Sequence, residues 1–585
     1  MVIFDINLFK RSLTASVAVG FVAVCLSGCH SAAYKKRADR ETNRILGKKV
    51  QGVDNVEWAD VDITLPEPAT LEGLGMNPEN AEYLGKEAEL ESSAKMIPLD
   101  EALHLAIQHN RDYLTQKEAI FLQALNLTLT RHAFAPIFAA DGDVTRQSGA
   151  RTGDTVVEVI PATLLEDGTV DPEGVETEVI AIVAENTVSQ NRHYGVSKLT
   201  KTGARIAADF TSDFLKFVIG DRQANNSQLA VSVLQPILRG GGTTATMEAL
   251  TQGERDLLYS LRDFANFRRE FIVGIANDYY FTLQARDQVQ NNWVAYQAFV
   301  KNVEREMALA EENRRTQTEI GQLRQALLNA ESRWVNSLSD YKSQLDAFKI
   351  TLGLPVDDNL VLDYPELKDL RIEDPGVSRN DAVEVALVNR PDLQTSKDQI
   401  VDAERGIKVA ENGLLPGLDL EVNYDAISDP SDITPGLNLK RQNLSATIDL
   451  DLPFDRKEDR NVYRAALIGL EQAKRSDSLN FDNVRLQIYD DWRALEQAKR
   501  NYEISDLGVS LAVRRLDEQF ELADLGRGEA RDLVDAQTDL VNAQNQRTAT
   551  LVTHTLARLR LWQNMGILYI NKDGSWIPQL AEEGR

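Results

Sequence analysis

The residue with the most recognisable chemistry is a cysteine near the start of the chain. Cys29 ends the stretch Leu-Ser-Gly-Cys over 26–29, which follows two basic residues and an uncharged apolar run over 12–26. This layout is typical of a secretory signal, and small residues before a cysteine are typical of a bacterial lipobox, in which the thiol takes a lipid such as palmitate. We expect a lipoprotein signal peptide over 1–28 and a mature chain that begins at a lipidated Cys29. The competing interpretation is that Cys29 is one more apolar residue of the leader.

The residue after this cysteine bears on location. It is His30 and not an aspartate, and by the general pattern of lipoprotein sorting this favours the outer membrane over the inner one. No later segment offers about 18 consecutive apolar residues, so any membrane crossing would be made by strands.

Other residues capable of chemistry are few. Cys25 and Cys29 are the only cysteines, so we expect neither a disulfide framework nor a cysteine metal site. His104 and His109 are five apart, which does not place them on one helix face as a metal-ligand pair requires. The chain has no GxSxG motif, and LRGGG over 238–242 lacks the Lys-Ser/Thr of a phosphate-binding loop. We expect no enzyme activity, no metal and no cofactor. The net charge of −26 also argues against a nucleic-acid binder, which needs basic surface.

The longest elements are helical. The stretch from Arg456 to Leu568 contains no proline and keeps a near-heptad apolar rhythm, which is typical of helices that pack against partner helices. The segment 525–528 (Leu-Gly-Arg-Gly) interrupts it with residues suited to a tight turn. We predict an antiparallel helical hairpin.

The chain repeats its own pattern. IPLDEALHLAIQHNRDYL from Ile97 matches VSRNDAVEVALVNRPDL from Val377, and the register holds until Pro136 falls on Pro416. Such a match indicates an internal tandem duplication. The resulting organisation is a lipid-anchored polar arm at 29–96 that lies along the body or serves as a linker, a first repeat at 97–353, a linker at 354–376, a second repeat at 377–568 and a tail at 569–585.

Each repeat also contains strands. Apolar and polar residues alternate over 418–425 and 444–452, and we place the matching strands of the first repeat near 137–147 and 228–235. This predicts four strands per chain, with one apolar face. Prolines mark the hinges between strands and helices, at Pro136, Pro236, Pro416 and Pro453.

Four strands cannot close a sheet. In a membrane, each unpaired backbone group at an open edge costs several kcal/mol, and three chains would remove these edges by forming a closed barrel of twelve strands. From the alternation alone, a soluble sandwich with one wet face remains the alternative.

The first repeat carries an insert. Its acidic segment at 150–190 is expected to be an extracellular loop. The sequence around Gly203 resembles an added strand pair over 193–215, which either joins the barrel wall or forms an external cap.

Taken together, these features resemble the TolC-like outer membrane factor family, the trimeric exit ducts of efflux pumps and type I secretion systems. The residues that carry the resemblance are Asn110–Asp112 with Asn389–Asp392, Pro136 and Pro416, LQPILRGGG over 234–242, and LGRGEARDLVDAQ over 525–537. The resemblance covers about 97–568. It implies an α+β membrane protein in the outer membrane, in which a trimeric twelve-stranded barrel continues into a periplasmic α-helical coiled-coil barrel.

The resemblance also implies partners. These are two further copies in a homotrimer, outer membrane lipid, a periplasmic adaptor (membrane fusion) protein and an inner-membrane RND or ABC transporter. The transporter class and the exported substrate do not follow from the chain. The competing function is a lipid-anchored periplasmic coiled-coil scaffold without a pore.

Site residues follow from the same resemblance. Aspartates after the second hairpin turn line the family's periplasmic entrance, and they fall here on Asp532 and Asp535, which are three apart and so share a helix face. The competing interpretation is an ordinary solvated helix surface. The positions at which the family docks its adaptor fall on the two turns, at Glu312, Asn313, Arg314, Arg315, Leu525, Gly526, Arg527 and Gly528.

The chain departs from the family in its latch. The family's latching tyrosine and arginine fall on Ala523 and Gly528. Arg527 or Arg531 could substitute for the missing arginine, and the sequence does not decide between them.

Overall fold

The computed structural model describes residues 31–578 except 65, 67, 69, 70, 72, 77–80, 160–175, 218–222, 312–316, 429–440, 526, 528 and 572–575. The predicted signal peptide, the predicted lipid site Cys29 and the last residues of the tail lie outside the described residues. The chain divides into two compact units. The helical unit comprises the chain up to Asn126, Arg255–Val401 and the chain from Gln472, and the sheet unit comprises Leu127–Glu254 and Asp402–Glu471.

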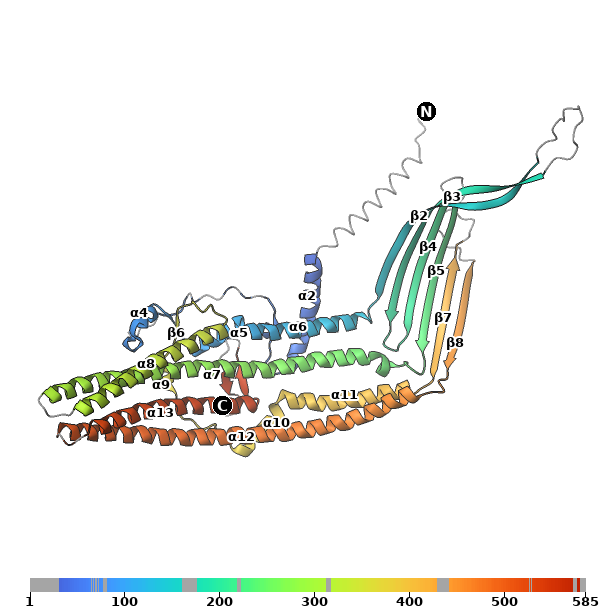
Figure 1. Ribbon diagram of the computed structural model, residues 1–585. Coiled ribbons are helices and arrows are strands. Elements are labelled where there is room, and N and C mark those ends of the chain that lie inside the picture. The colour runs from blue at the N-terminus through green and yellow to red at the C-terminus, as the bar shows by residue number, and fades with distance from the viewer. Residues whose placement is uncertain are drawn as a thin grey trace, which may run out of the picture. The chain divides into compact units, whose positions relative to one another are not determined.

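Four long helices dominate the chain (Figure 1). They are α7 (Thr243–Glu311, 69 residues), α8 (Gln317–Thr351, 35 residues), α12 (Lys457–Asp524, 68 residues) and α13 (Ala530–Asn564, 35 residues). Helices α12 and α13 confirm the hairpin predicted between Arg456 and Leu568. Their lengths far exceed the ~11 residues usual in globular domains, because each is stabilised by packing along its partner helices.

A pair of shorter helices precedes the strands in each half. These are α5 (Leu99–His109) with α6 (Arg111–His132), and α10 (Arg379–Asn389) with α11 (Pro391–Gly413). The order of two helices, strands and a long hairpin therefore occurs twice, and the tandem duplication itself stays a prediction.

The Asn-Arg-Asp element separates α5 from α6. The side chain of Asn110 accepts a hydrogen bond from the backbone N–H of Tyr113 at 2.9 Å and donates to the carbonyl of Thr351 at 2.7 Å. It thus caps the start of α6 and fixes the end of α8. In the second half, Pro391 begins α11, and Arg390 binds Asp392 through two hydrogen bonds of 3.0 and 2.7 Å. The motif is therefore a helix break with its own cap.

The helical unit has one main apolar core. Aromatic and aliphatic side chains of α7, α8 and α13 meet there, among them Tyr279, Leu283, Phe348 and Leu556, all less than 5% exposed. Around this core, strand β1 (Lys95–Ile97) pairs in parallel with β6 (Leu360–Leu362), which precedes the short helix α9 (Pro365–Asp369). Strand β9 (Leu568–Ile570) pairs with β10 (Trp576–Pro578).

The N-terminal arm packs as part of the helical unit. This is the arrangement along the body that the sequence allowed, and not a free linker. Its described elements are α2 (Ser31–Lys49), η1 (Val50–Gly52), α3 (Trp58–Val61), η2 (Glu82–Glu87), α4 (Ala88–Glu91) and β1. Charged side chains tie it down in the interior. Asp60 accepts a hydrogen bond from the buried Arg268 at 2.8 Å. Glu91 pairs with Arg286 at 3.0 Å and accepts a hydrogen bond from Tyr341 at 3.0 Å.

Tyr341 serves this buried pair as a neutral donor. Burial raises the pKa of its hydroxyl well above the usual range, so the hydroxyl keeps its proton and donates a hydrogen bond to Glu91. Arg286, 1% exposed at its side chain, also donates to the hydroxyl of Tyr83 at 2.7 Å. A buried charge is tolerated only when it is paired and hydrogen-bonded, and these partners provide both.

The sheet unit contains one antiparallel sheet, in the order β2-β3-β4-β5-β7-β8 (Figure 1). Its strands are β2 (Ile137–Val159), β3 (Glu176–Leu199), β4 (Arg205–Phe217), β5 (Gln223–Pro236), β7 (Gly417–Ile427) and β8 (Gln442–Asp451). The four strands predicted from alternation are confirmed as β2, β5, β7 and β8. The predicted number of four strands per chain was wrong. The strand pair around Gly203 joins the same sheet, as its strands β3 and β4, and brings the number to six.

The acidic insert also differs from its prediction. It was expected to be a loop, but β2 continues to Val159 and β3 starts at Glu176, with Val156 paired to Val179. Valine, isoleucine and threonine are frequent in both segments, and these β-branched residues favour strands. Residues 160–175 lie outside the described part of the chain.

The prolines lie where strands meet helices. Pro136 and Pro416 directly precede β2 and β7, β5 ends at Pro236, and Pro453 follows the end of β8. Because proline has no backbone N–H, it cannot continue a helix or a sheet ladder. Asn412 joins two of these junctions, since it accepts a hydrogen bond from the N–H of Gly240 at 2.7 Å and donates to the carbonyl of Leu238 at 3.1 Å.

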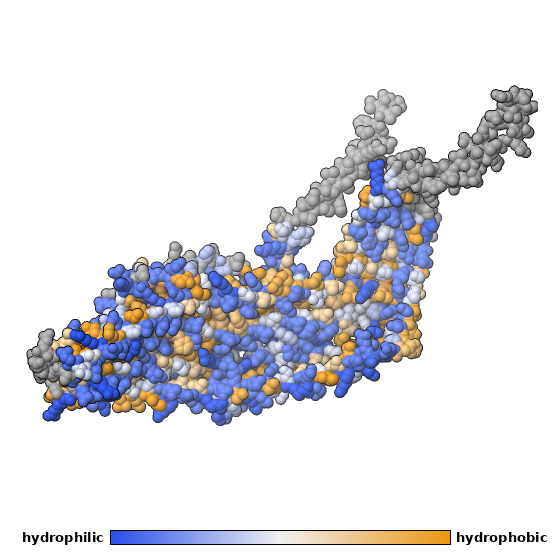
Figure 2. Space-filling model, viewed as in Figure 1, coloured by the Kyte–Doolittle hydropathy of each residue, from blue (hydrophilic) through white to orange (hydrophobic). Residues whose placement is uncertain are grey.

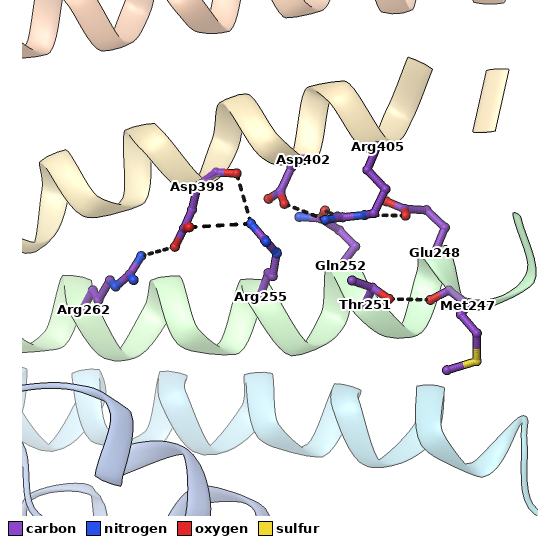
Figure 3. A network of polar contacts seen from close by, with 9 residues as sticks. All are labelled: Met247, Glu248, Thr251, Gln252, Arg255, Arg262, Asp398, Asp402 and Arg405. Atoms are coloured by element: carbon purple, nitrogen blue, oxygen red, sulfur yellow. Dashed lines mark hydrogen bonds and ion pairs between the residues drawn. The ribbon is translucent and has the colours of Figure 1, made fainter. Parts of the chain in front are cut away.

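Ion pairs hold α7 against α11 within each unit (Figure 3). In the helical unit, Asp398 lies 2.7 Å from Arg262 and 3.8 Å from Arg255. In the sheet unit, Arg405 lies 2.5 Å from Glu248. These side chains are partly buried, so their attraction is less screened by solvent than that of fully exposed pairs.

Replacing Arg286 by Ala should destabilise the helical unit by about 3–5 kcal/mol, because the buried Glu91 would lose this counter-charge. The matched control is Lys342→Ala, which removes a half-exposed ion pair with Glu87 and should cost about 0–1 kcal/mol. Chemical denaturation monitored by circular dichroism compares the two. Equal losses would show that burial does not set the strength of the Arg286 contact.

Candidate functional site at the second hairpin turn

The second hairpin turn is short and backbone-bonded. Helix α12 ends at Asp524 and α13 begins at Ala530. The N–H of Leu525 donates to the carbonyl of Glu521 at 3.1 Å, and that of Arg527 donates to the carbonyl of Leu522 at 2.9 Å. These bonds use carbonyls at the helix end that have no partner within the helix.

Of the predicted docking residues, the structure describes two. Leu525 and Arg527 are both exposed, Leu525 to 70%. Glu312, Asn313, Arg314, Arg315, Gly526 and Gly528 lie outside the described residues. An exposed leucine at the turn is available to an apolar pocket of a partner, and the docking role stays a prediction.

The apolar face of α13 is covered by neighbouring helices. Ala530 and Val534 lie in small apolar clusters with Val303, Leu323 and Leu327 of the first hairpin. Leu533 and Ala536, 4% and 0% exposed, pack against Leu516 and Phe520 of α12. At ~100° per residue, these four positions cover one side of the helix.

The acidic residues occupy the opposite side. Asp532 and Asp535, the predicted entrance residues, are both exposed, and so is Asp539 one turn further on. The three carboxylates fall within about 60° of the helix circumference, turned away from the packed face. The structure therefore brings the two predicted aspartates together on one free surface and adds a third.

Basic side chains moderate this acidic surface. The Arg531 guanidinium lies 3.8 Å from a carboxylate oxygen of Asp535, and Arg515 of α12 forms an ion pair with Asp539. Asp532 sits in the first turn of α13, where the positive end of the helix dipole favours a negative charge. Among the described residues, no basic side chain forms an ion pair with Asp532, whereas Asp535 pairs with Arg531 and Asp539 pairs with Arg515.

The latch positions look different. Ala523 is buried at 8% exposure, so it has neither the hydroxyl of the family's tyrosine nor an exposed side chain that could contact another chain. Gly528 lies outside the described residues. Of the two arginines considered as substitutes, Arg531 is the one already engaged with an entrance aspartate. A latch between chains stays a prediction.

The sheet carries a second acidic surface, which the sequence showed only strand by strand. One face of the sheet carries Asp141 and Asp143 of β2, Asp209 and Asp213 of β4, Glu421 and Asp425 of β7, and Asp449 of β8. His193 of β3 bridges two of them across three strands, with Asp141 at 2.8 Å and Asp209 at 3.0 Å. The alternation of acidic with apolar residues was visible, but cross-strand neighbours depend on register, which the sequence did not give.

The opposite face of the sheet is apolar. It includes Phe138 at 80% exposure, Ile206 at 41%, and Leu444 and Ile448 at 70% each. Large apolar side chains remain uncovered on the surface of the protein (Figure 2). A contiguous apolar face of this kind marks a surface made for a partner or a membrane.

Within the part of the chain that the structure describes, no histidines, cysteines and carboxylates cluster as a metal site would require. Among the same residues, no helix combines the length and the apolar character needed to span a bilayer.

The fold is that of solved outer membrane channels. The structure matches the CmeC outer membrane channel of Campylobacter jejuni over 86% of this chain and 94% of that one, at a TM-score of 0.55 and 14% identity. It matches the outer membrane protein VceC of Vibrio cholerae over 80% and 96%, at 0.56 and 13%. The open state of the MtrE outer membrane channel of Neisseria gonorrhoeae matches over 80% and 88%, at 0.54 and 12%. No protein-family model and no curated protein matches the sequence. The chain thus has the fold of these solved outer membrane channels.

Replacing Leu533 by Ala should loosen the turn, because it removes a buried side chain from the contact with α12 and costs about 2–5 kcal/mol. Leu525→Ala, at an exposed position, should change stability by less than about 0.5 kcal/mol. Hydrogen exchange of the amides over 516–540 measures the difference. Unchanged protection in Leu533→Ala would contradict the assignment of the packed face.

Proposed function

We propose that the chain is the outer membrane exit duct of a tripartite efflux pump or type I secretion system. The observation that carries this proposal is a single sheet with an apolar face and two unpaired edges, joined in one chain to helical hairpins of 69 and 35, and 68 and 35 residues. The channel fold shared with solved outer membrane proteins supports it.

Three copies complete the duct. In a membrane, the edges of β2 and β8 leave backbone groups without partners, and closing the sheets of several chains into one barrel satisfies them. The apolar face then meets lipid and the acidic face lines the lumen. The hairpins continue the wall into the periplasm, where their turns meet the adaptor and, through it, an inner-membrane RND or ABC transporter.

The scaffold alternative has no use for the sheet. A periplasmic coiled coil without a pore would not need an uncovered apolar face bearing Phe138, Leu444 and Ile448. In water, that face and its open edges would promote aggregation. Lipid attachment at Cys29 fits both functions, so it does not distinguish them.

The aspartates of α13 form the entrance. Threefold symmetry places six carboxylates from Asp532 and Asp535 around one axis, which favours cations and allows multivalent cations to block. Arg531 reduces this charge at each Asp535. The entrance thus combines a ring of carboxylates that favours cations with arginines that partly neutralise its negative charge.

The purified trimer should conduct ions after incorporation into planar lipid bilayers, because the lumen is lined by charged and polar side chains. Single-channel recording measures this. A stable, membrane-inserted trimer that never conducts would eliminate the duct and leave the scaffold.

Replacing both Asp532 and Asp535 by Asn should weaken block by a trivalent cation by about tenfold or more, which corresponds to ~1.4 kcal/mol of lost binding. The matched control is Asp340→Asn, which removes one exposed carboxylate from α8 far from the turn. Blocker titration of single channels compares the variants. Equal block in all of them would assign the aspartates to the solvated helix surface.

Arg531→Gln should act in the opposite direction, because it frees Asp535 from its 3.8 Å neighbour and raises the negative charge at the ring. We expect cation block to strengthen a few-fold in the same titration. Arg514→Gln, at an exposed position of α12, provides the control. Weaker block in Arg531→Gln would show that the arginine does not act on Asp535.

A further inference from the structure

The β3–β4 hairpin is built into the full height of the sheet. Strand β3 pairs with β2 from Ser197 to Thr187 and beyond, and with β4 from Leu199 to Thr187. Strand β4 pairs in turn with β5 from Arg205 to Lys216. The hairpin therefore lies between β2 and β5, which without it would be neighbours.

The turn of this hairpin is locked to the base of the sheet. The carbonyl of Thr202 accepts hydrogen bonds from the N–H of Gly242 at 3.1 Å and from the side chain of Gln235 at 3.2 Å. Gly203 has a φ of +93°, and a Cβ there would lie 2.9 Å from the carbonyl oxygen of Gly240. The β3–β4 turn thus packs directly against the glycine-rich segment after β5. An external cap would not require this close contact.

The side chains of the hairpin extend both faces of the sheet. On β4, Ile206 and Phe210 point to the side that bears Val233 and Leu229 of β5, because they are paired with these residues in register. Between them, Asp209 points to the acidic side. The apolar and the acidic face therefore both continue onto the added strands, with Gln190 and Arg192 of β3 as polar residues on the apolar side.

The two edge strands are suited to another copy of the same chain. The six strands alternate in direction, so β8 of one copy would run antiparallel to β2 of the next. Strands β7 and β8 have 11 and 10 residues, close to the ~9–11 that cross a bilayer when tilted. Nearly all of β8 is exposed on both faces, as expected of a strand that awaits a neighbour.

We propose that β3 and β4 belong to the barrel wall, so that three copies form a barrel of eighteen strands. This inference rests on the proposed function. At a strand spacing of ~4.8 Å and a tilt of ~40°, eighteen strands give a backbone diameter of about 36 Å, against about 24 Å for twelve. After allowance for side chains, the lumen is wide enough for larger cargo than a twelve-stranded duct passes.

Spin labels on neighbouring residues of β4 test the placement. Cysteines are introduced singly at Phe210 and Thr211, whose side chains point to opposite faces. The chain has only two native cysteines, Cys25 and Cys29, and labelling of the parent protein gives the background. In lipid vesicles, a label at 210 should collide with oxygen, which is enriched in lipid, severalfold more than with a water-soluble nickel chelate. A label at 211 should show the reverse.

A matched pair on β7 separates the two proposals. Cysteines at Val422 and Asn423 probe a strand that was predicted to cross the membrane from alternation alone. If the β7 pair alternates and the β4 pair is water-accessible at both positions, the hairpin is an external cap and the eighteen-stranded wall is wrong. If neither pair alternates, the proposed duct itself fails.

End-on electron microscopy of the trimer measures the diameter independently. A barrel of about 36 Å supports eighteen strands, whereas one of about 24 Å overturns the inference even if the labels alternate.

Discussion

The structure depends on the unpaired backbone groups at the two edges of its sheet. Among the described strands, β2 and β8 each have one edge that pairs with no further strand, and lipid supplies no partners for its N–H and C=O groups. A single copy therefore cannot insert its apolar face into a membrane without a large cost. For the proposed duct, this constraint makes association of several copies the condition for inserting the sheet into a membrane.

The helical part solves a different problem, since its surface must serve neighbours on several sides. On α13, Leu533 and Ala536 are taken by α12, and Ala530 and Val534 by the first hairpin. Only the remaining side is free to carry charge. The acidic surface at the turn is thus a consequence of packing, because no other side of the helix could hold Asp532 and Asp535 without burying them.

The N-terminal arm shows how charges far apart in the chain hold the molecule together. Glu91 meets Arg286 and Tyr341, and Asp60 meets Arg268, all in the interior. Each charge is tolerable only because its partner is present. The polar segment, for which the sequence allowed either an arm along the body or a linker, is therefore a fixed part of the helical unit.

The sequence by itself determined the local elements. The heptad rhythm from Arg456 and the alternation from Leu418 each fix one structure, because side-chain period decides which face is buried. Prolines fixed where those elements end. The tertiary structure alone decided the strand neighbours: the hairpin around Gly203 could have joined the sheet or lain outside it, and only its pairing with β2 and β5 placed it in the sheet. Pairing between distant segments leaves no periodic trace, so β3, β4, the Glu91–Arg286 pair and the acidic face across β2, β4 and β7 became visible only in the folded chain.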